Sequence, residues 1–324
     1  MGLTVLSCFF STLPSRSLVQ LKGQGTFLIL VFTVALLVDG EDVELALDLW
    51  RITAAYLVLR GFLEYAAGFD NLEARLKGGM SVHMTYAGLL MVFVFVLGAR
   101  SLWGAGPRAS RVADLLVAGG ALVGVGLTLT RNTYLGLAAG AVAVALAVRP
   151  KLVLAVPVAA VLLVLALPAS VKERALSTLD SKDETARDRL LMWRAGAQMV
   201  ADRPFFGVGP GRVKELYPVY RLPGFFEPRP GHLHNNVVNT AAETGIPSAL
   251  AYLAFVAAFF VHAVRRLRTT PPGGPRAVLL GSIGAMTALF VAGMFEYNFG
   301  DVEVLMATLV VSALPFAGTR AGEQ

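Results

Sequence analysis

Charged residues are scarce in this chain. They make up 15% of its 324 residues, while hydrophobic residues make up 56%; a soluble globular domain carries about 25% charged residues. This balance excludes an ordinary soluble enzyme and indicates a protein that crosses a membrane several times. The net charge of +6 does not indicate nucleic-acid binding, because the basic residues lie mostly between apolar runs. We therefore expect a lipid bilayer around the chain and no nucleic-acid partner.

Cysteine is scarce as well, and the chain has one long polar interval. Cys8 is the single cysteine, which excludes an intramolecular disulfide. The longest polar interval covers residues 169–235, and no internal repeat is evident. The chain is therefore expected to form one transmembrane domain over residues 1–324, with 169–235 as a large loop within it.

Long apolar runs dominate the rest of the chain. A helix needs roughly 17–25 apolar residues to cross the hydrocarbon core. The clearer candidates are residues 81–98, 112–130, 152–168, 246–264 and 277–295. The shorter or more polar candidates are residues 25–38, 45–63, 133–148 and 302–316. These runs predict an all-α, polytopic membrane fold with about nine or ten transmembrane helices.

The basic residues of short loops predict the orientation of these helices. Loops 99–111, 149–151 and 265–276 are rich in arginine and lysine, as cytoplasmic loops are. If all three are cytoplasmic, the spans between them alternate correctly and the loop 169–235 lies outside. The acidic interval 39–44 fits this orientation less well. The prediction therefore depends on the three basic loops.

Arg131 stands between two apolar runs, at the predicted outer face. Two readings of such an arginine remain open. Its side chain can extend to a lipid headgroup and have no role in substrate binding. Alternatively, its guanidinium can bind the phosphate of a lipid-linked substrate.

The sequence of the predicted outer loop has the pattern of an amphipathic helix. Residues 183–203 carry an apolar stripe at helical spacing, Pro204 follows, and the turn-forming "GVGPG" comes next. Such a helix is expected to lie at the membrane surface. The members of the stripe are Leu190, Trp193, Ala197 and Val200. Arg189 lies four residues before Trp193 and so on the same face.

His232 and His234 stand one residue apart, just before the apolar run that begins at 246. An H-x-H pair is a weak metal signal, and acidic residues are sparse nearby, so we expect no metal. The residues leave two alternatives. Either histidine hydrogen-bonds the backbone at a helix start, or one takes a proton from a hydroxyl near neutral pH.

The same stretch has the spacing of a known family. His234, Asn235 and Gly245 stand where ligases of bacterial envelopes carry His, then Asn, Ser or Gln, and later Gly; Ser248 replaces the family's last small residue. The chain thus resembles the O-antigen ligase and polymerase superfamily. Three further stretches also resemble that family, in the same order along the chain: residues 75–91, 187–211 and 295–306.

The resemblance implies a GT-C-like enzyme in the bacterial inner membrane with its active site facing the periplasm. It would transfer a glycan from undecaprenyl diphosphate to lipid A–core, without metal or other cofactor. A polysaccharide polymerase, which transfers to another lipid-linked glycan, is the alternative. A transporter or flippase is a remote one, because few charges lie inside the spans. Family members commonly have more spans, so N-terminal helices are expected to be missing.

The resemblance also implies roles for single residues. His234 matches the family's catalytic histidine, and Arg131 and Arg189 match the arginines expected to neutralise the leaving diphosphate. Further substrate contacts are expected from Arg187, Asn235, Trp193 and Glu243.

Cysteine labelling tests the predicted orientation. In a chain with Cys8→Ser, single cysteines replace Arg108 or Lys182, and intact cells are treated with a membrane-impermeant maleimide. We expect the cysteine at 182 to react and the one at 108 to stay unlabelled, because the reagent reaches only the outer face. Labelling at 108 but not at 182 would contradict the orientation.

Overall fold

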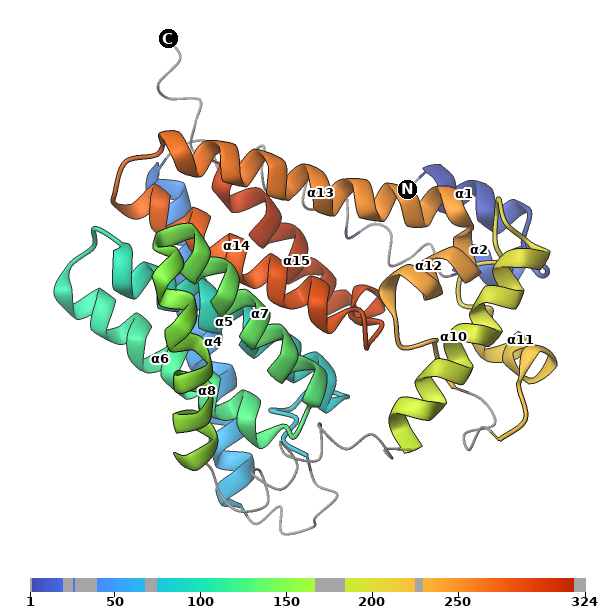
Figure 1. Cartoon of the computed structure of the whole chain (residues 1–324), viewed down its shortest axis with the longest axis horizontal. Helices are drawn as coiled ribbons and strands as arrows, with labels where there is room; N and C mark the ends of the chain where they lie inside the picture. Colours follow the sequence, from blue (N-terminus) through green and yellow to red (C-terminus); the bar gives the residue numbers. More distant parts are fainter. Residues whose placement is uncertain are drawn as a thin grey trace. The chain divides into compact units, whose positions relative to one another are not determined.

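A computed structural model describes residues 2–19, 26, 40–67, 75–166, 184–224 and 230–317. All regular structure within these ranges is helical (Figure 1). Five of the helices are long and apolar enough to cross a membrane. The predicted polytopic helical fold is thereby confirmed. Most of the candidate span 25–38 lies outside the described residues.

The five long apolar helices follow the apolar runs closely. They are α5 (His83–Trp103), α6 (Arg108–Leu127), α7 (Arg131–Val148), α13 (Ile246–Thr269) and α14 (Gly274–Ala292). The run 152–168 is different. Its described part is a 3-10 turn at Pro150–Leu154 and the 12-residue α8 (Ala155–Ala166), which is shorter than a span. The run 302–316 forms the short apolar α15 (Val302–Ala313).

The chain divides into two compact units. The site unit consists of Met1–Ile29, Asp180–Phe259 and Gly293–Val302. The bundle unit consists of Leu30–Leu179, Phe260–Ala292 and Glu303–Gln324. Each unit is described by itself.

The bundle unit is built on close contacts between α5, α6, α7 and α14 (Figure 1). Glycines permit the closest of these contacts. A Cβ at Gly140 of α7 would lie 2.6 Å from the carbonyl oxygen of Gly284, and one at Gly136 would lie 2.7 Å from that of Ala288. In membranes, small residues allow helix backbones to approach and gain dispersion contacts that lipid cannot replace. The packing of α7 on α14 therefore depends on these glycines.

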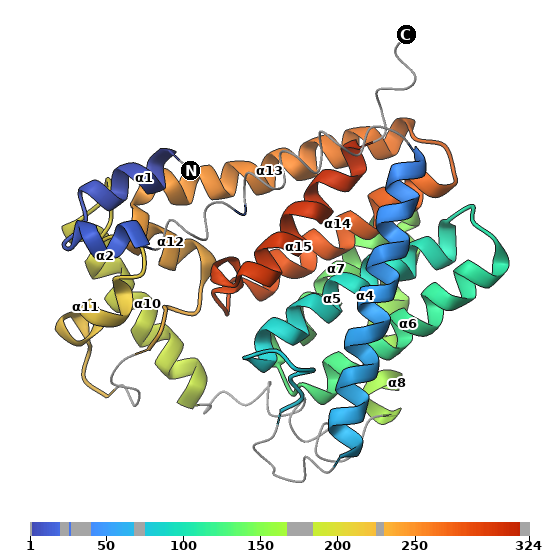
Figure 2. The same cartoon turned by 180° about the vertical axis from the view of Figure 1, so that it is seen from behind.

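The long helix α4 (Gly40–Ala66) has two contrasting faces. It packs against α5 and α6 in the bundle unit, as the rear view shows (Figure 2). Apolar side chains at helical spacing cover its outer face and are 55–63% exposed: Leu45, Leu49, Ile52, Tyr56, Leu59 and Leu63. This face is suited to lipid. The helix also carries the charged residues that made 45–63 one of the more polar candidate spans, and these charges need partners on the inner face.

Those partners are present. Arg100 of α5 binds Glu44 and Asp48 of α4, both at 2.7 Å. Arg51 of α4 binds Asp48 at 3.1 Å and Asp114 of α6 at 3.4 Å. Asp114 is fully buried. A buried charge is tolerated only when it is paired, so this network is what attaches the charged helix to the bundle.

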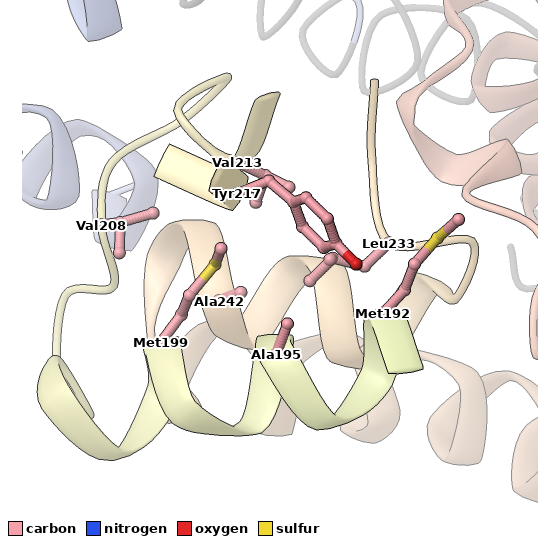
Figure 3. Packing of buried hydrophobic residues seen from close by; sticks show 8 residues of the cluster. All are labelled: Met192, Ala195, Met199, Val208, Val213, Tyr217, Leu233 and Ala242. Atoms are coloured by element: carbon pink, nitrogen blue, oxygen red, sulfur yellow. The ribbon is translucent and has the colours of Figure 1, made fainter. Parts of the chain in front are cut away.

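The site unit packs around one apolar cluster (Figure 3). Its helices are α1 (Gly2–Phe9), α2 (Pro14–Val19), α10 (Glu184–Asp202), α11 (Val213–Tyr220), α12 (Asn236–Thr244) and the first part of α13. The buried members of the cluster are Met192, Ala195, Met199, Val208, Val213, Tyr217, Leu233 and Ala242. The helix predicted before Pro204 is α10. Its packed face is rotated from the predicted stripe, because Trp193 and Val200 lie at the edge of the cluster while Leu190 is exposed.

Helix α1 and the turn that follows it, up to Ser11, direct their hydroxyl side chains inward. The hydroxyl of Ser7 donates to the carbonyl oxygens of Phe206 and Glu243, and that of Ser11 donates to Val208. The outer face is apolar and exposed at Leu3, Leu6, Phe9 and Phe10. Water would favour the opposite arrangement, so the outer face of α1 is suited to lipid hydrocarbon.

The glycine contact of α7 can be tested with a matched pair of substitutions. Gly140→Ala should lower the melting temperature of the detergent-solubilised protein, because the new methyl group meets Gly284 and Phe95. Gly119→Ala in α6 is the control, since a Cβ there meets nothing within 4 Å. Removal of backbone freedom should leave that variant unchanged or more stable by about 0.5–1 kcal/mol. Equal melting temperatures for the two variants would show that the glycine contact contributes nothing.

Candidate functional site

The His-x-His segment leads directly into α12. Asn235 is the N-cap of this helix: its Oδ1 accepts the backbone N–H groups of Val237 and Val238 at 2.9 and 3.0 Å. These two bonds satisfy donors that a helix start leaves unpaired. The Nδ2 of Asn235 donates to the carbonyl oxygen of Met294 at 2.9 Å. The side chain expected to contact substrate is thus engaged within the protein.

Asn236 binds the segment 293–299 from three positions. Its backbone N–H donates to the carbonyl oxygen of Gly293 at 2.7 Å, and its Nδ2 donates to Oδ1 of Asn298 at 2.7 Å. Its Oδ1 accepts the backbone N–H of Phe299 at 3.0 Å. Asn236 is 2% exposed. These bonds fix the residues after α14 against the start of α12.

The result is a contact that the sequence did not reveal. Glu296 accepts a hydrogen bond from Nδ1 of His234 at 2.9 Å and lies 3.3 Å from Nε2 of His232. Its side chain is 4% exposed, whereas those of His232 and His234 are 33% and 20% exposed. Glu296 and His234 are 62 residues apart. The one sequence signal for Glu296 was its place in the stretch 295–306, which resembles the family.

The hydrogen bonds assign different roles to the two histidines. The backbone N–H of His234 donates to Nδ1 of His232 at 3.3 Å, so a neutral His232 carries its proton on Nε2, which lies 3.3 Å from the Glu296 carboxylate. His234 donates its Nδ1 proton to the same carboxylate. Its Nε2 therefore keeps a lone pair, and no hydrogen bond to a described residue occupies it. His234, and not His232, is arranged to accept a proton.

Burial and neighbouring charges shift the pKa values of Glu296 and His232. Burial acts to raise the pKa of Glu296, but the hydrogen bond from His234 and the electrostatic effect of both histidines hold it below its usual value. Burial lowers the pKa of His232, although Glu296 opposes the shift. The carboxylate is therefore ionised and His232 neutral near pH 7, as the proton assignment requires.

The backbone of His234 is strained. Its φ is 47°, in the left-handed region that non-glycine residues seldom adopt; such a conformation costs on the order of 1–3 kcal/mol. Hydrogen bonds on both sides offset that cost. The backbone N–H of Leu233 donates to Oδ1 of Asn239 at 3.0 Å, and Asn236 is bound to Gly293.

Two N–H donors of α10 face this region without partners. Nε of Arg189 and Nε1 of Trp193 are buried and have no hydrogen-bond partner among the described residues. Burial lowers the pKa of Arg189, while the charge of Glu296 raises it, so the guanidinium acts close to the carboxylate. The ring of Trp193 packs on that of Phe295, 6.3 Å between centroids. Buried donors that lack acceptors are suited to an anionic group.

The other predicted site residues lie in different settings. Arg187 is exposed at the start of α10. Glu243 is 8% exposed and lies inside the site unit. Arg131 is the first residue of α7 and belongs to the bundle unit. Of the predicted set, the site unit thus contains every residue except Arg131, namely Arg187, Arg189, Trp193, His234, Asn235 and Glu243. Their substrate contacts remain predictions.

A metal site is the other chemistry to consider here. Among the described residues, the donor atoms of His232, His234 and Glu296 lie within 4.8 Å of one another. A metal ion would need lone pairs on the nitrogens that face Glu296. Nδ1 of His232 accepts the backbone N–H of His234, so Nε2 of a neutral His232 carries the proton and offers no lone pair. His234 and Glu296 alone are fewer ligands than a zinc site uses, so these residues fit a proton-transfer group better than a metal.

Gly245 explains the spacing of the motif. It ends α12 with φ of 89°, and a Cβ there would lie 2.1 Å from the carbonyl oxygen of Phe205. The next residue, Ile246, begins α13, and its backbone N–H donates to Pro204 at 2.7 Å. Only glycine fits this bend. The distance from His234 to Gly245 in the sequence is therefore set by the length of α12.

Comparison with known proteins gives a family match. Residues 115–253 match a family model described as O-antigen ligase. The matched region includes Arg131, Arg189, His234 and Gly245. None of the curated proteins matches the chain. Members of the family act in glycan transfer of the O-antigen ligase or polymerase type. Over these residues the chain is similar to the O-antigen ligase family, which supports the resemblance to the O-antigen ligase superfamily.

Proposed function

We propose that this protein ligates O-antigen to lipid A–core. The donor is a glycan linked to undecaprenyl diphosphate, and the reaction takes place at the periplasmic face of the inner membrane. The observation that carries the proposal is the pairing of His234 with Glu296, which leaves Nε2 of His234 available in the unit that also holds two unpartnered donors of α10.

His234 is the general base in this reaction. Nε2 takes the proton of the acceptor hydroxyl while the hydroxyl oxygen attacks the anomeric carbon of the donor glycan. The positive charge that develops on the ring is stabilised by Glu296, whose carboxylate accepts the Nδ1 proton at 2.9 Å. A base of this kind contributes about 10²–10⁴-fold to the rate.

The leaving group is the lipid diphosphate. As the bond between the anomeric carbon and the phosphate oxygen breaks, negative charge grows on that oxygen. Arg189 and Trp193 supply the two buried N–H donors for it, and buried donors stabilise such charge more strongly than exposed ones. Arg131 is proposed as a second cation for the diphosphate, by the family's pattern. The products are the glycosylated acceptor and undecaprenyl diphosphate.

No step in this scheme needs a metal ion. The phosphate charge is neutralised by arginine, and the acceptor is activated by histidine. The proposal is therefore that transfer is independent of divalent cations.

Substitution of the two histidines tests the proposed base. Glycan transfer from an undecaprenyl diphosphate donor is measured with purified protein in excess EDTA. His234→Ala should lower the rate by about 10²–10⁴-fold, because the free Nε2 is lost. His232→Ala should cost much less, since its lone pair is already bonded to the backbone of His234.

Protein level and melting temperature serve as controls for both variants. An inactive His232→Ala together with an active His234→Ala would show that His232, and not His234, is the base. Activity in both variants would remove histidine from the chemistry. Loss of wild-type activity in EDTA that Mg²⁺ or Mn²⁺ restores would overturn the metal-independent mechanism.

A deletion strain separates ligation from polymerisation. Without the ligase, long polymer should accumulate on undecaprenyl diphosphate while lipid A–core stays bare, because chain growth is intact and only the final transfer is missing. The measurement is gel and mass analysis of the envelope glycans. Single repeat units in place of long polymer would show that the protein is a polymerase.

A further inference from the structure

Asn239 and Glu243 form a buried polar pair beneath the His-x-His segment. They lie four residues apart on α12 and therefore on one face of that helix. Asn239 is fully buried and Glu243 is 8% exposed. Neither side chain takes part in the mechanism above, so their retention in the interior of the site unit requires another explanation.

Asn239 binds the peptide between the two histidines. Its Oδ1 accepts the backbone N–H of Leu233 at 3.0 Å. Its Nδ2 makes no hydrogen bond of good geometry. Burial raises the pKa values of Glu243 and Tyr297, and the nearby Nδ2 opposes that rise in both. The amide thus presents its oxygen to the histidine segment and its NH₂ group to two acceptors behind it.

Glu243 is held in place by backbone donors. The N–H groups of Gly211 and Val213 bind its carboxyl group. Tyr297 is the titratable group that faces it, while Arg212, between the two donors, is paired with Glu215. Burial raises the pKa of Glu243 to about 7 in spite of these bonds, so the carboxyl changes charge near neutral pH.

We propose that Asn239 and Glu243 are positioning residues of the transfer site, and that ionised Glu243 keeps the amide of Asn239 turned toward Leu233. An asparagine amide can turn over, and then its NH₂ group would face the N–H of Leu233 and their bond would be lost. An ionised carboxylate behind the amide accepts from NH₂ and opposes that turn. His234, whose left-handed backbone follows Leu233, would lose its support. This inference rests on the proposed role of His234.

The proposed pair predicts how the transfer rate and the stability depend on pH. Transfer should rise with pH through about 7 as Glu243 loses its proton. Stability should move in the opposite direction. The folded pKa lies above the ordinary value of 4.5, so the folded state binds more protons between these values and unfolds more easily as pH rises through them. A merely structural group would make activity follow stability.

Exchange of the amide and the carboxyl tests the pair. Asn239→Asp still offers an acceptor to Leu233 but places a second carboxyl beside Glu243, and kcat should fall about 10²-fold, the cost of a misplaced catalytic group, with little change in KM. Adding Glu243→Gln returns an NH₂ donor to the pair and should restore most of the loss. Thr240→Ala, on the next position of α12, is the matched control and should keep the wild-type kcat.

The single Glu243→Gln variant removes the titrating carboxyl group of Glu243 and so shows its effect on the pH profile. Its kcat/KM should lack the rise through about pH 7 that ionisation of Glu243 gives the wild type. Full activity of Asn239→Asp, or no rescue by the double exchange in a protein of normal melting temperature, would overturn the inference. If these variants fail while His234→Ala is still inactive, the proposed base stands without the pair. If His234→Ala is active, the proposed function itself is wrong.

Discussion

The bond network of Asn236 is the constraint on which the site depends. It joins the start of α12 to residues 293–299, although the two segments are 62 residues apart in the chain. Asn235 adds a bond to Met294 from the same turn. Without these contacts nothing would place Glu296 beside His234, and the histidine would lack both its orientation and its counter-charge. Two adjacent asparagines thus convert a helix start and a distant turn into one chemical group.

Burial gives that group its properties. In a medium of low effective dielectric, the carboxylate of Glu296 and the guanidinium of Arg189 act more strongly than they would in water. The site unit packs around an apolar cluster, and helix α1 turns Ser7 inward while its apolar side chains point outward. Helix α4 of the bundle unit shows the same reversal, since its ion pairs lie inward and its leucines outward. Both units thus have the polarity expected in lipid, with charges retained only where they have partners or a task.

Local patterns predicted the parts of this structure whose causes are local. The apolar runs located α5, α6, α13 and α14, and the periodic stripe before Pro204 located α10. The pairing of His234 with Glu296 was not predicted, because periodicity carries no information about which distant segments meet. The packed face of α10 was also rotated from the prediction, since Met192 and Met199 fill the cluster better than Leu190. The family spacing of Gly245 was visible in the sequence, but its cause, the bend against Phe205, was not.

The left-handed backbone at His234 bears on how this site tolerates change. At a φ of 47° most side chains are disfavoured, whereas asparagine, aspartate, histidine and glycine adopt the conformation more readily. Asparagine is one nucleotide away from histidine in the genetic code. A single base change can thus produce a chain that keeps its shape and its place in the membrane and yet has no base. Inactive relatives of this protein would be recognised by that exchange rather than by any disturbance of the fold.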